Sequence, residues 1–243
     1  MADDSFALND AWLMSMLPFV RENLPAPPAH VVEIGCGSLG GFVPALAAVG
    51  YHAVGVDPEA PEGALFHQLA FEQFAAEPPA VAPADVVIAS LSLHHVDDPA
   101  VVLDAVVGLL APGGVVVVLE WASERFDEAT ARWCFARLGA PPGVAHDHDH
   151  DDHDSHSWLH HLADQWRASS NPWDVYFEGW LEEGGLHPGE TIIGRLQERF
   201  DTLLLSDGPY FFTDLEATRE DELAAIRAGE IQPACLQFVG RGR

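Results

Sequence analysis

Lysine is absent from this chain of 243 residues, and all eleven of its basic residues are arginine. With 38 acidic residues, the formal net charge is −27 at pH 7. The first 120 residues contain fifteen acidic residues, Glu120 included, and a single basic residue, Arg21. Nucleic acids and anionic membranes are bound through clustered cations that neutralise phosphates. We therefore expect neither nucleic acid nor a membrane as a partner.

Cysteine is scarce as well, and the three thiols are scattered, at Cys36, Cys134 and Cys235. Their odd number and their spacing exclude a disulfide framework and fit a reducing compartment. Residues 1–5 lack the basic start and apolar segment of a signal peptide. The most apolar stretch, 101–119, is interrupted by Asp104 and by 112–114, so it is too short for a membrane helix. We expect a cytoplasmic protein.

The first half of the chain alternates between apolar runs typical of strands and patterns typical of helices. Strands are expected at 31–34, 52–56, 65–67, 85–89 and 115–119, and helices at 42–49 and 98–110. The β-branched runs lack polar alternation, which is typical of a parallel sheet covered by helices on both faces. A hydrophobic content of 48% supports a packed core rather than disorder.

The second half is more varied. A helix is expected at 124–138, followed by a Pro/Gly break, a His/Asp-rich loop at 146–161 and a Trp-rich helical region to about 199. A strand at 200–205, a helix at 214–228 and a strand at 235–239 complete the pattern. The sequence therefore predicts a single α/β domain over 1–243, with a helical insertion or lid at about 140–197.

A glycine-rich turn joins the first expected strand to the first helix, as Gly35-Cys36-Gly37-Ser38-Leu39-Gly40. Glycines allow a ligand to approach the backbone, and the helix N-terminus offers free N–H groups. Asp57 follows twenty residues after Gly37, at the end of the second strand, where it can accept hydrogen bonds from ribose hydroxyls. An ordinary strand-to-helix turn is the alternative, but the combination favours an adenosine cofactor.

Four further features complete the pattern: Glu33, two residues before Gly35, the Leu93-His94-His95 turn, the segment Leu110-Ala111-Pro112-Gly113-Gly114, and two strands that bracket a helix near the end. Together they resemble class I S-adenosylmethionine-dependent methyltransferases, strongly over 31–121 and loosely over 200–240. The resemblance implies a Rossmann-like sheet of seven mostly parallel strands, the last antiparallel, with helices on both faces. It also implies S-adenosylmethionine as the cofactor.

By this resemblance, the cofactor-binding residues are Glu33, Gly35, Cys36, Gly37, Asp57, Pro58, Phe71, Ser90 and Leu91. Glu33 would hold the turn or the amino group of the methionine moiety, and Asp57 would bind the ribose. The acid with which many members bind the adenine is replaced by Ala70, so that contact would fall to the backbone near Phe71.

Methyl transfer from a sulfonium is an in-line displacement in which the protein aligns the reactants and excludes water. A base is needed only where the nucleophile starts protonated. The candidates are His94, His95 and His187, with Glu120 as a further possibility, because histidine titrates near neutral pH. For at least one of His94 and His95, the alternative is a polar turn that caps a helix or orients the cofactor.

Two segments leave alternatives open. The dense aromatics between Trp158 and Trp180 are either the core of the insertion or, with Trp12 and Phe19, an apolar pocket for a small aromatic or polyketide-like substrate. Seven histidines lie in 146–161. Four interpretations of them stay open: a solvated loop, a site for a divalent metal at His146, His148 and His150, adventitious metal binding, and a pH-sensitive loop.

The leading hypothesis is methyl transfer to a small molecule, and the scarcity of cations favours a neutral or cationic acceptor. The alternatives are a module that binds or regulates without turnover, and a metal-handling protein that uses the His/Asp loop. A nicotinamide dehydrogenase is disfavoured by Glu33 and by the turn at 112–114.

Overall fold

The computed structural model describes residues 11–76, 83–139 and 155–243. The chain divides into two compact units. Unit 1 comprises Met1–Trp121, His187–Ser206 and Leu236–Arg243, and unit 2 comprises Ala122–Leu186 and Asp207–Cys235. The prediction of a single domain with an insertion at 140–197 stays a prediction.

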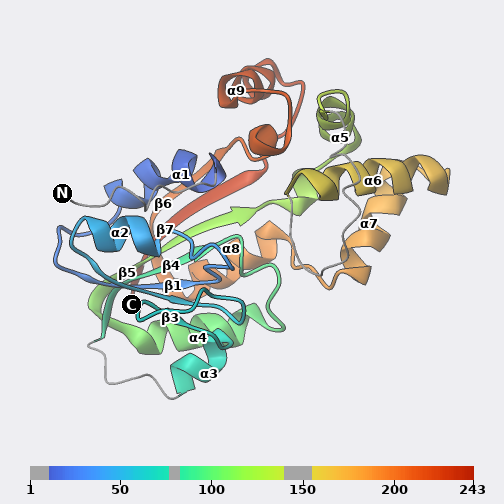
Figure 1. Cartoon of the computed structure of the whole chain (residues 1–243). Helices are drawn as coiled ribbons and strands as arrows, with labels where there is room; N and C mark the ends of the chain where they lie inside the picture. Colours follow the sequence, from blue (N-terminus) through green and yellow to red (C-terminus); the bar gives the residue numbers. More distant parts are fainter. Residues whose placement is uncertain (1–10, 77–82, 140–154) are drawn as a thin grey trace. The chain divides into compact units, whose positions relative to one another are not determined.

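Among the described residues, seven strands form one sheet in the order β3-β2-β1-β4-β5-β7-β6 (Figure 1). They are β1 His30–Ile34, β2 His52–Val56, β3 Phe66–His67, β4 Ala84–Ser90, β5 Leu110–Trp121, β6 Phe200–Gly208 and β7 Cys235–Gly242. Strands β1 to β5 pair in parallel, and the last strand is antiparallel. The predicted fold class is confirmed.

Burial explains why the parallel strands carry no polar alternation. From Val31 to Ile34 every residue of β1 is buried, and six of the seven residues of β4 are buried. The core on one face of the sheet is shared by α3 Phe71–Ala76, α4 Pro99–Leu109 and α8 Gly189–Arg199. Figure 1 shows α1 Ala11–Glu22 and α2 Val43–Ala48 on the opposite face from α3 and α4.

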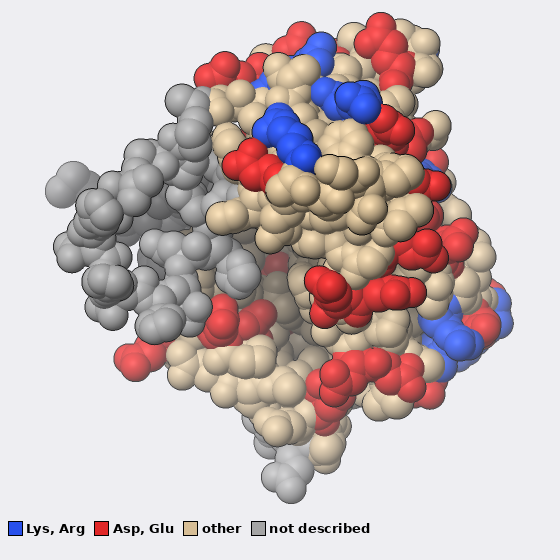
Figure 2. Space-filling view, turned by 90° about the vertical axis from the view of Figure 1, so that its right-hand side faces the viewer, with Lys and Arg blue, Asp and Glu red and all other residues tan. Residues whose placement is uncertain are grey.

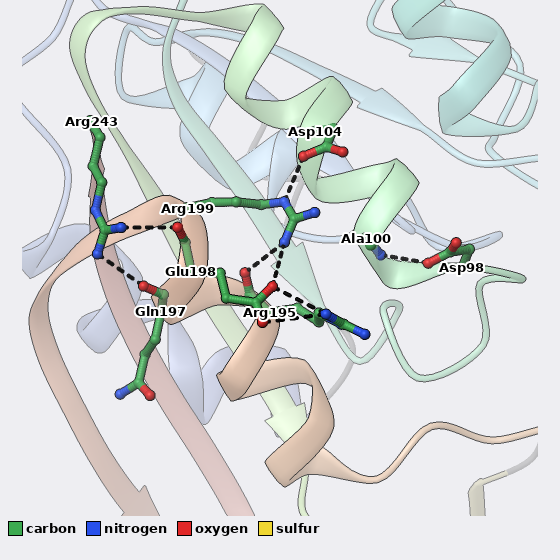
Figure 3. Close-up of polar contacts among 8 residues, drawn as sticks. All are labelled: Asp98, Ala100, Asp104, Arg195, Gln197, Glu198, Arg199 and Arg243. Atoms are coloured by element: carbon green, nitrogen blue, oxygen red, sulfur yellow. Dashed lines mark hydrogen bonds and ion pairs between the residues drawn. The ribbon is translucent and has the colours of Figure 1, made fainter.

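Arginines tie α8 to other elements of unit 1 (Figure 3). Arg199 Nε donates to Asp104 Oδ1 of α4 over 2.6 Å, and this guanidinium lowers the pKa of the Asp104 carboxyl. Arg243 donates to the carbonyl oxygens of Gln197 and Glu198 over 3.0 and 2.9 Å. The helix therefore packs with the sheet, although the sequence placed most of it in the predicted insertion.

Several boundaries differ from the sequence expectation because side chains cap the helices. The helix expected at 124–138 is a short 3₁₀ turn, η1 Ser123–Arg125, followed by α5 Glu128–Phe135. Asp127 Oδ1 accepts from Thr130 N over 2.8 Å and starts α5. The helix expected at 214–228 is likewise η2 Phe211–Asp214 followed by α9 Arg219–Ala228, which starts at a Thr218 capping box.

Two further differences concern unit 1. The fifth strand begins at Leu110 rather than 115, because the segment expected as a turn forms an irregularity within β5. Ala84 pairs with Leu110 but Val86 pairs with Val115, so the extra residues bulge out of the ladder. Helix α3 was not expected from the sequence.

In unit 2, aromatic side chains form a packed core with α6 Ser155–Ser169 and α7 Trp173–Glu183. Trp173 stacks on Phe177 with ring centroids 4.9 Å apart, and its Nε1 donates to the carbonyl oxygen of Phe126 over 2.7 Å. Phe126 in turn packs against Phe211. Of the two roles that the sequence left open for these aromatics, Trp173 and Phe177 serve the core.

Candidate active site

The glycine turn after β1 meets the end of β2. Gly35 N donates to the carbonyl oxygen of Val56 over 2.9 Å, and Gly37 N donates to Asp57 Oδ2 over 3.0 Å. The other carboxylate oxygen of Asp57 accepts from Glu59 N over 2.8 Å. Two segments that the sequence linked only by spacing thus lie together at the carboxyl edge of the parallel strands, where α/β folds bind ligands.

Gly35 allows this turn to lie against the loop after β4. Its φ of +70° is in the left-handed region, and a Cβ atom there would lie 2.2 Å from Ser92 Cβ. No residue with a side chain fits this position without displacing the loop. The glycine turn and the loop that carries the predicted histidines are therefore in direct contact.

Glu33 supports the turn from within the core. Its side chain is fully buried, and Oε2 accepts from Phe42 N, at the start of α2, over 2.8 Å. Burial raises the pKa of Glu33 to about 8, against the opposing effect of the hydrogen bond from Phe42. Among the described residues, Glu33 Oε1 has no hydrogen-bond partner. Of the two predicted roles, these contacts support holding the turn.

Glu120, at the end of β5, organises the loop after β4. It is fully buried, and its Oε1 accepts from the backbone N–H groups of Ser92 and Leu93 over 2.9 and 2.7 Å. Its Oε2 accepts from Trp121 N over 3.0 Å and lies 2.6 Å from His94 Nδ1. The role of Glu120 as a base stays a prediction, and in the structure both of its oxygens accept hydrogen bonds from this part of the chain.

The three predicted catalytic histidines have different surroundings. His94 is buried, with 6% of its surface exposed, and its ring lies edge-on to Trp121. His95 is exposed, and its ring centroid lies 4.1 Å from that of His94. His187 donates from its backbone N to the carbonyl oxygen of His94 over 3.0 Å, and its Nε2 lies 2.9 Å from the carbonyl oxygen of Val96. All three therefore meet at one loop.

The remaining predicted cofactor residues follow the strands of the sheet, since Pro58 lies after β2, Phe71 starts α3 after β3, and Ser90 ends β4. Pro58 is exposed, whereas Ser90 is buried at the end of β4. Phe71 packs its ring into the core, so only its backbone is left for a ligand. Leu91 has a φ of +51°, a strained conformation of the kind found at functional sites.

Cys36 and Ser92 complete the turn. Cys36 is buried, and burial raises the pKa of its thiol, which makes it a packing residue with little nucleophilic character. Ser92 was not predicted as a site residue. Its Oγ is buried against Gly35 and has no hydrogen-bond partner among the described residues.

The structure does not test the hypothesis of a metal site at the His/Asp-rich loop. His146, His148 and His150 lie outside the described residues. Within the described part of the chain, no group of three or more His, Cys, Asp or Glu side chains is placed to hold a metal ion. Over the same residues, no helix is long and apolar enough to cross a membrane.

Two other features bear on ligand binding. A cavity of about 530 Å³ lies at the amino-terminal edge of the sheet, lined by Asp85, Gly113 and Arg241 among others, and no predicted site residue lines it. On the described part of the face drawn in Figure 2, acidic side chains appear in many scattered places and basic side chains in fewer. This surface disfavours anionic ligands.

Comparison with known proteins gives one family. The sequence model of a methyltransferase domain matches residues 10–169. Among curated proteins, the chain is 36% identical over 116 residues to the ubiquinone biosynthesis O-methyltransferase of Xylella fastidiosa strain 9a5c. The aligned segment covers 42% of this chain and 46% of that protein, so the chain spans about half the length of the curated relatives it matches.

Solved structures with a similar fold cover nearly the whole chain. A putative S-adenosylmethionine-dependent methyltransferase from Listeria monocytogenes aligns with a TM-score of 0.54 at 16% identity, covering 96% of this chain and 98% of that one. The N-methyltransferase NodS from Bradyrhizobium japonicum WM9, in complex with S-adenosyl-L-homocysteine, aligns with a TM-score of 0.52 at 16% identity, covering 99% and 93%. At these identities the likeness concerns the fold alone.

Proposed function

The chain belongs to the methyltransferase-domain family and is a class I S-adenosylmethionine-dependent methyltransferase. From this premise we propose that the molecule it methylates is small and either neutral or cationic. When bound, S-adenosylmethionine supplies a methyl group made electrophilic by the sulfonium. The residues of this chain then have to hold the cofactor, align the acceptor and exclude water.

The observation that carries the site assignment is the hydrogen bond from Gly37 N to Asp57 Oδ2. This bond holds the Asp57 carboxylate beside the glycine turn, at the carboxyl edge of the sheet. There the carboxylate can accept hydrogen bonds from the ribose hydroxyls. Gly35, where a Cβ would collide with Ser92, keeps the turn close to the loop after β4. The residues therefore fit an adenosyl cofactor, with Ser90 and Leu91 at the methyl end.

Glu33 and the adenine contact complete the proposed cofactor site. Glu33 holds the turn through the hydrogen bond that its Oε2 accepts from Phe42 N. The position after β3 that holds an acid in many relatives is Ala70, so the backbone near Phe71 and the side chain of Pro58 take the adenine.

The charge distribution supports the acceptor class. Arg21 is the single basic residue in the first 120 positions. In unit 1, Arg195 and Arg199 are paired with Glu198, and Arg243 is paired with Asp201. An anionic acceptor would therefore meet few available cations. The curated relative acts on oxygen, and oxygen is the first atom to test here.

Calorimetry tests the cofactor assignment directly. We expect S-adenosylmethionine and S-adenosylhomocysteine each to bind the purified protein at one site, and absence of binding by both would overturn the proposal. A library of phenols, amines and carboxylic acids, followed by mass spectrometry for a gain of one methyl group, then tests the acceptor. Methylation restricted to the carboxylic acids would contradict a neutral or cationic acceptor.

A further inference from the structure

We propose that His94 is the general base that removes the proton of an ionisable hydroxyl acceptor, a phenol or catechol, and that Glu120 positions its ring. This inference rests on the proposed methyltransferase function and names its acceptor class and its base. The argument depends on the contacts of one buried histidine, of one buried carboxylate and of the loop that holds them.

The first step is the state of the imidazole. Glu120 Oε2 already accepts from Trp121 N, and it lies 2.6 Å from His94 Nδ1. Because a carboxylate oxygen accepts and does not donate, His94 Nδ1 carries the hydrogen of this bond. The neutral ring then presents Nε2 as a proton acceptor. Among the described residues, no hydrogen bond to His94 Nε2 is found.

The second step is the rigidity of the pair. Glu120 Oε1 accepts from Ser92 N and Leu93 N, so its carboxylate is held by three backbone N–H groups and cannot rotate away from the ring. A buried carboxylate on the far nitrogen of a histidine is the arrangement that orients a histidine base and stabilises its protonated form. A carboxylate needed only to tie down the loop could do so without the contact to His94.

The third step is the place of the ring. Ser92 touches Gly35 of the cofactor turn, and His94 follows two residues later in the same loop. His187 holds this loop at two carbonyl oxygens, donating to those of His94 and Val96. Because a carbonyl oxygen only accepts, His187 Nε2 carries a hydrogen, and its two hydrogen bonds to this loop assign His187 as a positioning residue.

The chemistry balances without any further reactant. The acceptor O–H bond breaks and its proton forms an N–H bond at His94 Nε2, next to the charge of Glu120. The oxygen electron pair forms the new bond to the methyl carbon while the carbon–sulfur bond breaks, so the sulfonium leaves as a neutral thioether. His94 then returns the proton to water. A neutral amine acceptor would not need this base.

A binding experiment without turnover tests the proton transfer. 4-Nitrocatechol is added to the 243-residue chain saturated with S-adenosylhomocysteine, and its absorbance reports whether the bound hydroxyl is ionised. We expect the phenolate spectrum at a pH below the solution pKa of the probe for the wild type and for His52→Gln, which alters an exposed histidine at the amino end of β2. His94→Gln should bind the phenol form. Identical spectra for His94→Gln and the wild type would overturn the inference.

Turnover separates this inference from the proposed function. With catechol as acceptor, His94→Gln should lower kcat by about 10²- to 10⁴-fold, leave the KM for S-adenosylmethionine unchanged, and have a smaller effect with the more acidic 4-nitrocatechol. Equal kcat for His94→Gln and the wild type, or methylation of amines but of no phenol, would overturn the inference while the methyltransferase function stands. Failure to bind S-adenosylmethionine would instead overturn the proposed function.

Discussion

The backbone N–H of Gly37 donates to Oδ2 of Asp57, twenty residues later in the sequence, over 3.0 Å. This bond joins the turn after β1 to the end of β2 and leaves the carboxylate at the carboxyl edge of the sheet. The geometry predicts that Asp57 holds both the turn and the ribose of the cofactor.

Asp57→Asn therefore should weaken cofactor binding. A hydrogen bond to a charged group contributes about 1.5–3 kcal/mol, so we expect the Kd for S-adenosylmethionine to rise about 10- to 100-fold. Calorimetry measures it, and Glu22→Gln, which removes an exposed carboxylate at the end of α1, is the control. Equal affinity of Asp57→Asn and the wild type would exclude Asp57 from the cofactor site.

Gly35→Ala tests whether the turn needs its close approach to Ser92. A Cβ at Gly35 would lie 2.2 Å from Ser92 Cβ, whereas a Cβ at Gly229 would meet no atom within 4 Å, and the two glycines have φ values of +70° and +71°. Gly229→Ala therefore reports the backbone strain alone, about 1–2 kcal/mol. We expect Gly35→Ala to lose a further 1–3 kcal/mol or so in urea unfolding, together with cofactor affinity. Equal losses of stability for Gly35→Ala and Gly229→Ala would show that the loop carrying Ser92 moves aside freely.

The sequence predicted the sheet because its strands leave a clear pattern. Buried parallel strands such as β1 and β4 read as continuous apolar runs, and the glycine turn marks where the first of them ends. The boundaries of α5 and α9 were wrong because short capping signals were overlooked. Thr218 and Asp221 have the spacing of a capping box, a pattern that is visible in the sequence.

The contacts of the candidate site were less accessible to prediction. Glu120 reaches Ser92 and His94 only because Ser90 pairs with Leu119 in the ladder between β4 and β5. His187 meets the same loop across a separation of 91 residues from Val96. Strand register and the docking of a distant segment determine these contacts, and neither leaves a local signal in the sequence.

Arg243→Met tests the attachment of α8. Arg243 donates to the carbonyl oxygens of Gln197 and Glu198 in the last turn of α8, groups that the helix itself leaves unpaired (Figure 3). Methionine keeps the apolar stem and removes the donors, so we expect a loss of about 0.5–1.5 kcal/mol in the free energy of unfolding. Arg241→Met is the control, because no hydrogen bond or ion pair is found for the exposed Arg241 in the described part of the chain. Equal urea midpoints for the two variants would contradict this role of Arg243.

Glu33 predicts a dependence of stability on pH. Burial raises its pKa from 4.5 to about 8, so between these values the folded protein retains a proton that the unfolded chain has lost. Unfolding then releases a proton, and the contribution of Glu33 to stability falls as pH rises through this window, by up to about 5 kcal/mol. Glu33→Gln cannot ionise and escapes this loss.

The free energies of unfolding of Glu33→Gln and the wild type should therefore be compared by urea titration at pH 5, 6.5 and 8. We expect the difference to shift steadily in favour of Glu33→Gln as pH rises, because the other titrating groups contribute equally to both proteins and cancel. Glu22→Gln, an exposed change of the same chemistry, should follow the wild type at every pH. Parallel curves for Glu33→Gln and the wild type would mean that Glu33 ionises as readily in the fold as in water, and that its burial does not hold the proton.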